Sequence, residues 1–276
     1  MTKPSIKSLL TIYRSLVLPV AHDALTAKLI ELAGFSAFSI GGFGVAASAF
    51  GKPDNGSVKF DDLFPIFKNI LKSTKLPALV DADTGYGGAR KAAAVVTAYE
   101  KVGASAIFIE DQAWPKRCGH TSGHKLISVS AMQAKIKAAK ASLKNNDTIL
   151  MARTDAISAE GSLNSAIVRA KAYIASGADA IFIEAPRSEA EIKGIPRALP
   201  ETILLINLME GGKTPLVPHN ILTDWGFQLI AHPITAILAQ TNAVKETLFD
   251  LKENNPFNKS VNGKVDFPMF RQIIGL

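Results

Sequence analysis

The chain has 276 residues, of which 47% are hydrophobic and 20% are charged, a composition typical of a globular protein. Its length suits one α/β barrel of about 250 residues as well as a pair of smaller domains. No apolar run reaches the roughly 20 residues needed to cross a membrane, and the N-terminus lacks a signal-peptide pattern. The single cysteine, Cys118, excludes an intrachain disulfide and is typical of a reducing compartment. We therefore expect a cytoplasmic protein that has no membrane partner.

The formal net charge of +7 raises the question of a nucleic-acid partner. The lysines are spread over predicted helical surfaces, without a nucleic-acid motif and without interleaved aromatic residues. We interpret them as a solvated basic surface, predict no nucleic-acid partner, and expect at most a mild attraction of anionic substrates. Examples on one predicted helix are Lys135, Lys137, Lys140 and Lys144.

Short apolar runs recur along the chain, with amphipathic segments between them. Such runs are typical of parallel strands that are buried on both faces. Ser130 and Ser162 are expected to cap two of the intervening helices. Eight alternations predict an α/β fold, a single (β/α)8 TIM barrel over residues 1–276 with a C-terminal helical extension from about residue 241. The expected strands are Leu16–Ala21, Ala37–Gly41, Ala78–Ala82, Ala106–Glu110, Ile149–Arg153, Ala180–Glu184, Ile203–Asn207 and Leu229–His232.

Two stretches of the chain are nearly identical, Gly103–Asp111 and Gly177–Ala185. In each stretch, a helix is expected to end at the glycine, and a strand then delivers Glu110 or Glu184 at its C-terminal end. We interpret the repeat as recurrent loop chemistry between helix and strand, which supports the alternating architecture.

Polar side chains follow the predicted strands at their C-terminal ends, the face where barrels of this type hold their active sites. Each alone could be a satisfied structural group, but carboxylates gathered on one face repel one another unless a cation lies among them. Because no His/Cys ligand set accompanies the acids, we predict Mg2+, with Mn2+ as a substitute, rather than Zn2+. Asp83 is the expected direct ligand, and Asp81 and Glu110 are expected to act partly through water. The strand-end residues are Asp81, Asp83, Glu110, Asp111, Arg153, Asp155, Glu184, Asn207 and Glu210.

A polar, glycine-rich segment without helical or strand periodicity covers residues 112–124, and we predict that this lid loop closes over the active site. Cys118 lies in it beside Lys116, Arg117 and His120, whose positive charge is expected to lower the pKa of the thiol. Such a thiol can serve as a general acid or base. The alternative is an inert cysteine in a surface loop. Zinc binding is not expected, because one cysteine with two histidines is an incomplete ligand set.

Seven short motifs follow one another along the chain, namely Gly44–Ser48, Gly51–Asp54, Asp81–Gly88, Ile109–Gln112, Lys116–His120, Ala152–Ala156 and Gly212–Leu216. Together they resemble the isocitrate lyase and phosphoenolpyruvate mutase superfamily over essentially the whole chain. The most similar branch is the methylisocitrate lyase-like group, which includes 2,3-dimethylmalate lyase, oxaloacetate hydrolase and the petal death protein. Lys116–His120 is the lyase-type loop, whereas phosphonate-forming mutases carry a cysteine-free sequence there.

The resemblance implies roles for individual residues. Asp83 corresponds to the family's direct Mg2+ ligand. The acids around the metal's water shell correspond to Asp54, Asp81 and Glu110. Arg153 corresponds to the arginine that grips a substrate carboxylate, which suits its bidentate geometry. The full candidate sets are Cys118, Lys116, Arg117, His120 and Glu184 for catalysis, Gly41, Gly42, Phe43, Arg153, Asn207 and Glu210 for substrate binding, and Asp83, Asp81, Asp54 and Glu110 for the metal.

The chain departs from the family pattern in two places that bear on the substrate. Residues 41–43 read Gly-Gly-Phe where family lyases have Ser-Gly-Gly, which removes a hydroxyl and adds bulk. Asn207–Gly212 is closer to the petal death protein and 2,3-dimethylmalate lyase group than to methylisocitrate lyases, so the substrate stays open. The family also implies a homotetramer that exchanges a C-terminal helix between neighbours. Thr241–Lys252 or Phe267–Ile274 could supply that helix.

The activity predicted from these features is that of a Mg2+-dependent carbon–carbon lyase. Its substrate would be a small 2-hydroxy dicarboxylate or tricarboxylate, methylisocitrate- or dimethylmalate-like, and its products a 2-keto acid and a carboxylate. Cys118, carried in by the lid loop, would protonate the carbanion. The alternatives are an oxaloacetate-type carbon–carbon hydrolase or decarboxylase and, less favoured, a phosphonomutase. The non-enzyme alternative is a dicarboxylate-binding barrel, which has no need of a positioned thiol.

Overall fold

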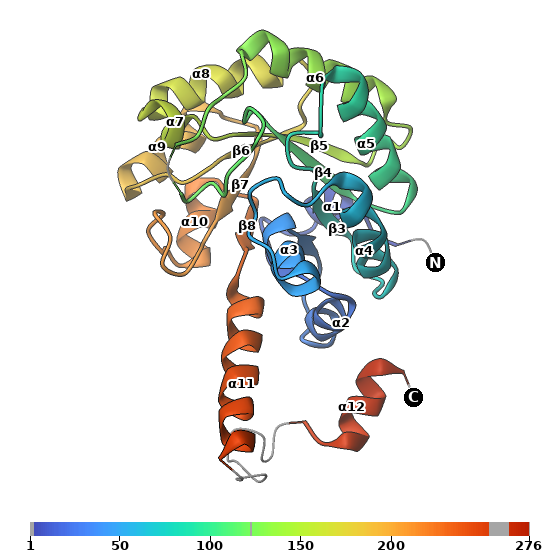
Figure 1. Cartoon of the computed structure of the whole chain (residues 1–276). Coiled ribbons are helices and arrows are strands. Elements are labelled where there is room, and N and C mark those ends of the chain that lie inside the picture. The colour runs from blue at the N-terminus through green and yellow to red at the C-terminus, as the bar shows by residue number, and fades with distance from the viewer. Residues whose placement is uncertain (1–2, 122, 254–264, 276) are drawn as a thin grey trace.

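The computed structural model describes residues 3–121, 123–253 and 265–275 of the chain. Eight parallel strands form a closed barrel, in which each strand pairs with the next along the chain and the last pairs with the first. Helices surround the barrel (Figure 1). The predicted (β/α)8 TIM barrel is confirmed. The strands are β1 (Leu16–Ala21), β2 (Phe38–Ile40), β3 (Ala78–Asp81), β4 (Ala106–Glu110), β5 (Ile149–Thr154), β6 (Ala180–Ile183), β7 (Ile203–Asn207) and β8 (Leu229–His232).

The predicted strand bounds agree with the structure to within one residue at either end. The helices of the described residues are α1 (Ile6–Leu9), α2 (Ala24–Leu32), α3 (Gly42–Phe50), α4 (Phe60–Lys72), α5 (Ala89–Lys101), α6 (Val129–Ser142), α7 (Ala156–Glu160), α8 (Leu163–Ile174), α9 (Glu189–Ala198), α10 (His219–Trp225), α11 (Thr235–Lys252) and α12 (Phe267–Ile274).

Buried apolar side chains form two layers, one inside the barrel and one between the barrel and its helices. Phe108 on β4 and Phe182 on β6 belong to the inner layer, with ring centroids 5.8 Å apart. Ile107 and Ile109, on either side of Phe108, belong to the outer layer. Because both faces of each strand are buried, the strands read as continuous apolar runs. The runs stop at the C-terminal rim of the barrel, where the first polar side chains appear.

Helix α6 corrects two sequence expectations. Its cap is Ser128 rather than Ser130, because the Ser128 hydroxyl accepts a hydrogen bond from the Ala131 N–H at 3.2 Å. Either serine has the chemistry of a cap, so the sequence alone did not separate them. Lys135, which we expected on the solvated surface, is 7% exposed, and its ammonium donates to the Thr84 carbonyl.

The C-terminal helices extend away from the barrel. Helix α11 begins at Thr235 rather than at Thr241, and it projects downward from the barrel in Figure 1. Helix α12 has the bounds that the sequence predicted. No residue of either helix is buried, and their exposed apolar side chains include Leu248, Phe249 and Phe267. Among the described residues, no helix combines the length and the apolar character that a membrane span requires.

Candidate active site

A cavity of about 80 Å3 lies at the C-terminal face of the barrel, between the strand ends and the lid loop. Gly42 lies directly behind it, where its N–H donates to Asp81 Oδ2 at 3.1 Å. Asp83 contacts Lys116 of the cavity wall. Most of the predicted site residues line this cavity, namely Gly41, Phe43, Asp54, Asp81, Glu110, Lys116, Arg117, Cys118, His120, Arg153, Glu184 and Asn207.

Glu210, which we predicted to bind the substrate, does not line this cavity. Its carboxylate accepts a hydrogen bond from the Thr235 hydroxyl at the start of α11. It lines a separate surface cavity with His219 and His232, whose Nε2 atoms are 2.8 Å apart. Its neighbour Met209 lines the central cavity, so the loop after β7 passes the site and the side chain of Glu210 points away from it.

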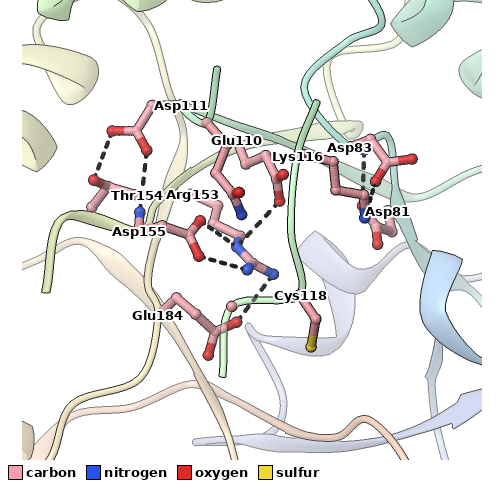
Figure 2. A network of polar contacts seen from close by, with 12 residues as sticks. Asp81, Asp83, Glu110, Asp111, Lys116, Cys118, Arg153, Thr154, Asp155 and Glu184 are labelled. Carbon is pink, nitrogen blue, oxygen red and sulfur yellow. Dashed lines mark hydrogen bonds and ion pairs between the residues drawn. The ribbon is translucent and has the colours of Figure 1, made fainter. Parts of the chain in front are cut away.

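An acidic cluster forms one wall of the cavity, where β3 ends. Asp83 has a φ of 49°, in the left-handed region that is costly for a residue other than glycine, and its N–H donates to Asp81 Oδ1 at 2.8 Å. The Lys116 ammonium reaches in from the lid loop and lies 2.5 Å from Asp83 Oδ1 (Figure 2). It also lies 2.6 Å from Asp54 Oδ1. The Tyr86 hydroxyl donates to the other oxygen of Asp83.

The electrostatics of the acidic cluster fit a divalent cation. Burial, followed by repulsion from Asp83, raises the pKa of Asp81 to about 6. Burial also raises the pKa of Glu110 well above its ordinary value, and Glu110 Oε1 has no hydrogen-bond partner among the described residues. The single positive charge of Lys116 therefore cannot balance the negative charges of all the carboxylates around it. Hard oxygen donors that repel one another in a buried site are what Mg2+ prefers.

The acidic cluster does not form a complete coordination shell among the described residues. Within the described residues, no three His, Cys, Asp or Glu side chains converge closely enough to form a ready coordination shell. Mg2+ usually takes one or two carboxylates directly and retains several waters, so a spread set of acids does not conflict with it. The residues that could hold the ion are Asp83, Asp81, Asp54 and Glu110.

Arg153, at the end of β5, occupies the centre of the site (Figure 2). Its Nε and Nη2 donate to the two oxygens of Asp155 at 2.9 and 2.8 Å. Its Nη1 lies 3.0 Å from Glu184 Oε2, and its Nε lies 3.4 Å from Glu110 Oε2. The two glutamates of the near-repeat thus meet at one guanidinium. This arrangement holds Arg153 in one orientation while its remaining N–H bonds can face a substrate carboxylate.

Glu184 connects Arg153 to the lid loop. Burial raises the pKa of Glu184, but the charge of Arg153 and the contact with His120 outweigh burial and hold it at about 2, so the group is ionised at neutral pH. Asn207 Nδ2 donates to Glu184 Oε2 at 3.2 Å. His120 Nε2 lies 3.1 Å from Glu184 Oε1, and the Lys213 N–H donates to His120 Nδ1. These contacts assign the proton of His120 to Nε2, facing Glu184.

The lid loop is fixed over the site by its backbone. The Gln112 side chain donates to the Arg117 carbonyl and accepts from the Arg117 N–H, both at 2.9 Å. His124 Nε2 lies 3.0 Å from the Cys118 carbonyl oxygen. A Cβ added at Gly119 would lie 2.5 Å from Arg153 Nη2 and from Glu184 Cγ. Only glycine at that position therefore lets the loop lie directly on the Arg153–Glu184 pair.

Cys118 lines the cavity, but its electrostatics differ from the sequence expectation. We expected Lys116, Arg117 and His120 to lower the pKa of the thiol. Instead, burial raises the pKa above its ordinary value, and the hydrogen bond from the His120 backbone and the attraction of Arg153 only partly offset burial. The physical reason is orientation, because Lys116 faces the acidic cluster and His120 faces Glu184. The thiol consequently keeps its proton at neutral pH.

Sequence reasoning missed the residues that support the site from behind. The Tyr86 hydroxyl donates to Asp83 and so positions it. The sequence could have suggested this contact, because Tyr86 follows the candidate metal ligand by only three residues. Asp111, which we counted among the strand-end acids, accepts hydrogen bonds from Thr154 Oγ1, the Asp155 N–H and the Tyr173 hydroxyl. It therefore positions the β5 end that carries Arg153, and it does not line the cavity.

Comparison with known proteins decides the family. The profile of the phosphoenolpyruvate phosphomutase family matches residues 6–252. The chain belongs to this family. The resemblance to the isocitrate lyase and phosphoenolpyruvate mutase superfamily is thereby confirmed.

Three relatives show the range of activities within the family. The 2,3-dimethylmalate lyase of Eubacterium barkeri is 37% identical over 275 residues, which cover 100% of this chain and 94% of the relative. The chloroplastic carboxyvinyl-carboxyphosphonate phosphorylmutase of Arabidopsis thaliana is 38% identical over 94% of this chain and 77% of the relative. The petal death protein of Dianthus caryophyllus is 34% identical over 99% of this chain and 86% of the relative.

Two solved structures share the fold over nearly the whole chain. Oxaloacetate acetylhydrolase in complex with the inhibitor 3,3-difluorooxalacetate superposes with a TM-score of 0.90 at 30% identity, covering 98% of this chain and 92% of that chain. Phosphonopyruvate hydrolase in complex with oxalate and Mg2+ superposes with a TM-score of 0.88 at 28% identity, covering 100% of this chain and 95% of that chain.

Proposed function

We propose that this protein is a Mg2+-dependent carbon–carbon lyase. Its substrate is a small 2-hydroxy dicarboxylate or tricarboxylate, methylisocitrate- or dimethylmalate-like, which it cleaves to a 2-keto acid and a carboxylate. The similarity to 2,3-dimethylmalate lyase over the full length of this chain supports the reaction class. The site supports it independently, because it combines a buried guanidinium, an acidic cluster and a protonated thiol in one cavity.

The observation that carries the proposal is the placement of Cys118. The thiol lies on the lid loop, lines the same cavity as Arg153 and the acidic cluster, and has a raised pKa. A group that stays protonated at neutral pH and faces the reacting atoms can act as a general acid. A protein that only bound a dicarboxylate would need Arg153 and the acidic cluster, but it would have no use for this thiol.

Each of these residues can be given a role in the reaction. Mg2+, held by Asp83 and by Asp81, Asp54 and Glu110 through water, would act as a Lewis acid toward the C1 carboxylate and the C2 oxygen. Arg153 binds and orients the substrate carboxylate, with its plane fixed by Asp155 and Glu184. The lid loop excludes water from the cavity, which protects a carbanion from solvent protons.

Cleavage of the substrate transfers one proton from the C2 hydroxyl and one proton to C3. The proton of the C2 hydroxyl leaves to a base, the C2–O bond becomes a carbonyl, and the C2–C3 bond breaks with its electron pair on C3. Cys118 then gives its thiol proton to C3, which forms the C–H bond of the carboxylate product. The base returns the hydroxyl proton to the Cys118 thiolate, so both groups end the turnover in their starting protonation states. Arg153 lies beside the developing charge, and its fixed position means that little reorganisation is needed during the step.

An oxaloacetate-type hydrolase is the second candidate. It is favoured by the similarity to oxaloacetate acetylhydrolase, whose fold this chain shares at a TM-score of 0.90. A decarboxylase and, less favoured, a phosphonomutase are the remaining alternatives. The Cys118-containing loop argues against the phosphonomutase, because carbanion protonation is not part of a phosphoryl rearrangement.

The experiment that separates these activities is a panel of 2-hydroxy and 2-keto dicarboxylates and tricarboxylates with Mg2+, followed by product identification. The lyase predicts a 2-keto acid and a carboxylate in equal amounts, and loss of turnover in EDTA that Mg2+ or Mn2+ restores. Oxalate and acetate from oxaloacetate would identify the hydrolase. Binding of dicarboxylates without any product would contradict enzymatic function altogether.

We also propose that the protein is a single barrel domain that assembles as a homotetramer, with the C-terminal helices exchanged between subunits. The exposed apolar side chains of α11 and α12 support this assembly, as does a groove of about 650 Å3 beside α11 that is lined in part by Val244 and Leu248. Light scattering measures the mass in solution of the full chain and of a chain that ends before residue 254 and therefore lacks α12. We expect a tetramer for the full chain and a smaller assembly for the shortened chain. A monomeric full chain would contradict the proposal.

The remaining proposals concern compartment and partners. We propose that the protein is cytoplasmic, because its single cysteine excludes an intrachain disulfide and agrees with a reducing compartment. Its partner is the small-molecule substrate, and we expect no duplex binding tighter than about micromolar at physiological salt. A salt-resistant complex in a gel-shift titration would contradict the latter.

A further inference from the structure

A second cavity, of about 740 Å3, lies outside the barrel wall. It is bounded by the start of α4, the β3–α5 loop, the segment after β4 and helix α6, and α4, α5 and α6 follow one another around the same side of the barrel in Figure 1. None of the described residues lines both this cavity and the central one. Its size falls within the range of about 300–1,000 Å3 that small-molecule sites occupy.

A buried ammonium forms part of its wall. Lys135 of α6 is 7% exposed, and its Nζ donates one hydrogen bond, to the Thr84 carbonyl at 2.8 Å. No carboxylate of the described residues lies within the 4.0 Å of Lys135 Nζ that an ion pair requires. The carboxylates of Glu110 and Asp111 attract this ammonium from beyond ion-pair distance. An ammonium has three protons to donate, and the hydrogen bond to Thr84 uses one of them. An anion in the cavity would supply the missing partner.

Further positive charge faces the same space. Lys59 and Lys91 line the cavity, whereas its wall contains one carboxylate, that of Asp61, among the described residues. Helix α5 begins at the cavity, and its cap, Gly88, offers no side-chain acceptor to the first N–H groups of that helix. Three ammonium groups and free helix amides against one carboxylate therefore favour an anion.

The other wall is aromatic. The rings of Phe60, Tyr86 and Trp114 follow one another, with centroids 5.5 Å and 6.4 Å apart. Two of the lysines lie against these rings, Lys59 at 5.1 Å from the Trp114 ring and Lys91 at 5.4 Å from the Phe60 ring. The planes of neighbouring rings are tilted by 58° and 49°, so a planar ring can pack against this wall through edge-to-face contacts. An anionic group attached to that ring can then reach the ammonium groups.

We propose that this cavity binds a small organic anion that carries a planar ring, such as a nucleotide or an aromatic carboxylate. The ring packs along Phe60, Tyr86 and Trp114, and the anionic group pairs with Lys135 and Lys91 near the start of α5. The Tyr86 hydroxyl donates to Asp83, so the occupant touches a residue that also positions the central site. The proposal does not depend on which reaction the central site performs.

Tryptophan fluorescence provides the test, because the chain has two tryptophans and Trp114 is the one that lines the cavity. In a Trp225→Phe variant, Trp114 is the sole reporter. Adenosine monophosphate and benzoate are titrated as ring-bearing anions, with inorganic phosphate and adenosine as partial probes, and calorimetry measures the same affinities. We expect one or both ring-bearing anions to quench Trp114 with a dissociation constant below about 1 mM, and each partial probe to bind at least tenfold more weakly.

Two variants and a matched control locate the binding. Lys135→Met and Lys91→Met should each weaken binding by about tenfold or more, as loss of a charge-assisted contact does. Lys137→Met removes the same charge from an exposed position on the same helix and should leave the affinity unchanged. If Lys135→Met does not fold, Lys91→Met decides alone.

Three results would overturn the proposal. The first is the absence of binding by either ring-bearing anion at 10 mM, about ten times the expected limit. The second is equal binding by the lysine variants and the wild type. The third is displacement of the ring-bearing anion by oxalate, which would place it in the central cavity instead.

Discussion

The ammonium of Lys116 lies 2.5 Å from the Asp83 carboxylate and 2.6 Å from that of Asp54, so a residue of the lid loop supplies positive charge to the acidic cluster at the end of β3. The lid-loop lysine and a bound cation would therefore neutralise the same carboxylates. With the loop in place, Lys116 offsets part of their repulsion, and a divalent cation would offset more of it.

The first prediction concerns this lysine. Lys116→Met leaves Asp54 and Asp83 without their ammonium partner, so the metal-free protein should melt at a lower temperature than the wild type. Added Mg2+ should raise the melting temperature of the variant by more than it raises that of the wild type, because binding to the folded state stabilises it. Lys137→Met is the matched control. An equal Mg2+-induced shift in all three proteins would contradict the prediction.

The second prediction concerns the direct ligand. Asp83→Ala should abolish turnover while circular dichroism shows an intact barrel, since the residue lies at the rim and not in the apolar core. Calorimetry should also show that Mg2+ binding is lost. A folded variant with near wild-type activity would show that the assignment of Asp83 is wrong.

The barrel and its strand ends could be predicted because the apolar run and the polar rim coincide at each strand. Asp81 and Glu110 follow buried runs directly, and their position on β3 and β4 required no knowledge of distant contacts. The same reasoning did not place Glu210, because Met209 lines the central cavity while Glu210 lines a separate one, and the sequence does not show which way a loop side chain points.

Side-chain direction was the information that the sequence lacked. Lys116, Arg117 and His120 are neighbours of Cys118 along the chain, but the Lys116 ammonium pairs with Asp83 and Nε2 of His120 faces Glu184. The charge expected to lower the thiol pKa is thus directed elsewhere. Lys135 was misplaced for a related reason, since helical periodicity does not show that the β3–α5 loop covers it.

The third prediction concerns Gly119. An added Cβ would lie 2.5 Å from Arg153 Nη2 and from Glu184 Cγ, so Gly119→Ala should lift the lid loop from the site. We expect kcat/KM to fall by about 10²-fold, the effect of misplacing reacting groups by an ångström. The melting temperature of the metal-free protein should fall about as far as that of Lys116→Met, because lifting the loop withdraws the same ammonium from Asp54 and Asp83. A loss of stability with unchanged kcat/KM would contradict this reading of the loop.

The fourth prediction is the pH dependence of turnover. Burial raises the pKa of Cys118 above its ordinary value of 9.0, and the proton that an acid donates is present below the pKa and lost as pH rises through it. The kcat should therefore show no loss from this group through neutrality and should decline only on the alkaline side. A kcat that rises between about pH 7 and 9 would instead identify a thiolate acting as a base.

The most direct test of the account is Cys118→Ser, measured as kcat together with the affinity for oxalate, an inert dicarboxylate. If the thiol protonates a carbanion, the variant should lose about 10²–10⁴-fold in kcat, because a hydroxyl is a far weaker acid. Its affinity for oxalate should match that of the wild type, because the acidic cluster and Arg153 are unchanged. An unchanged kcat, or a parallel loss of oxalate binding, would contradict the role of Cys118 as the proton donor.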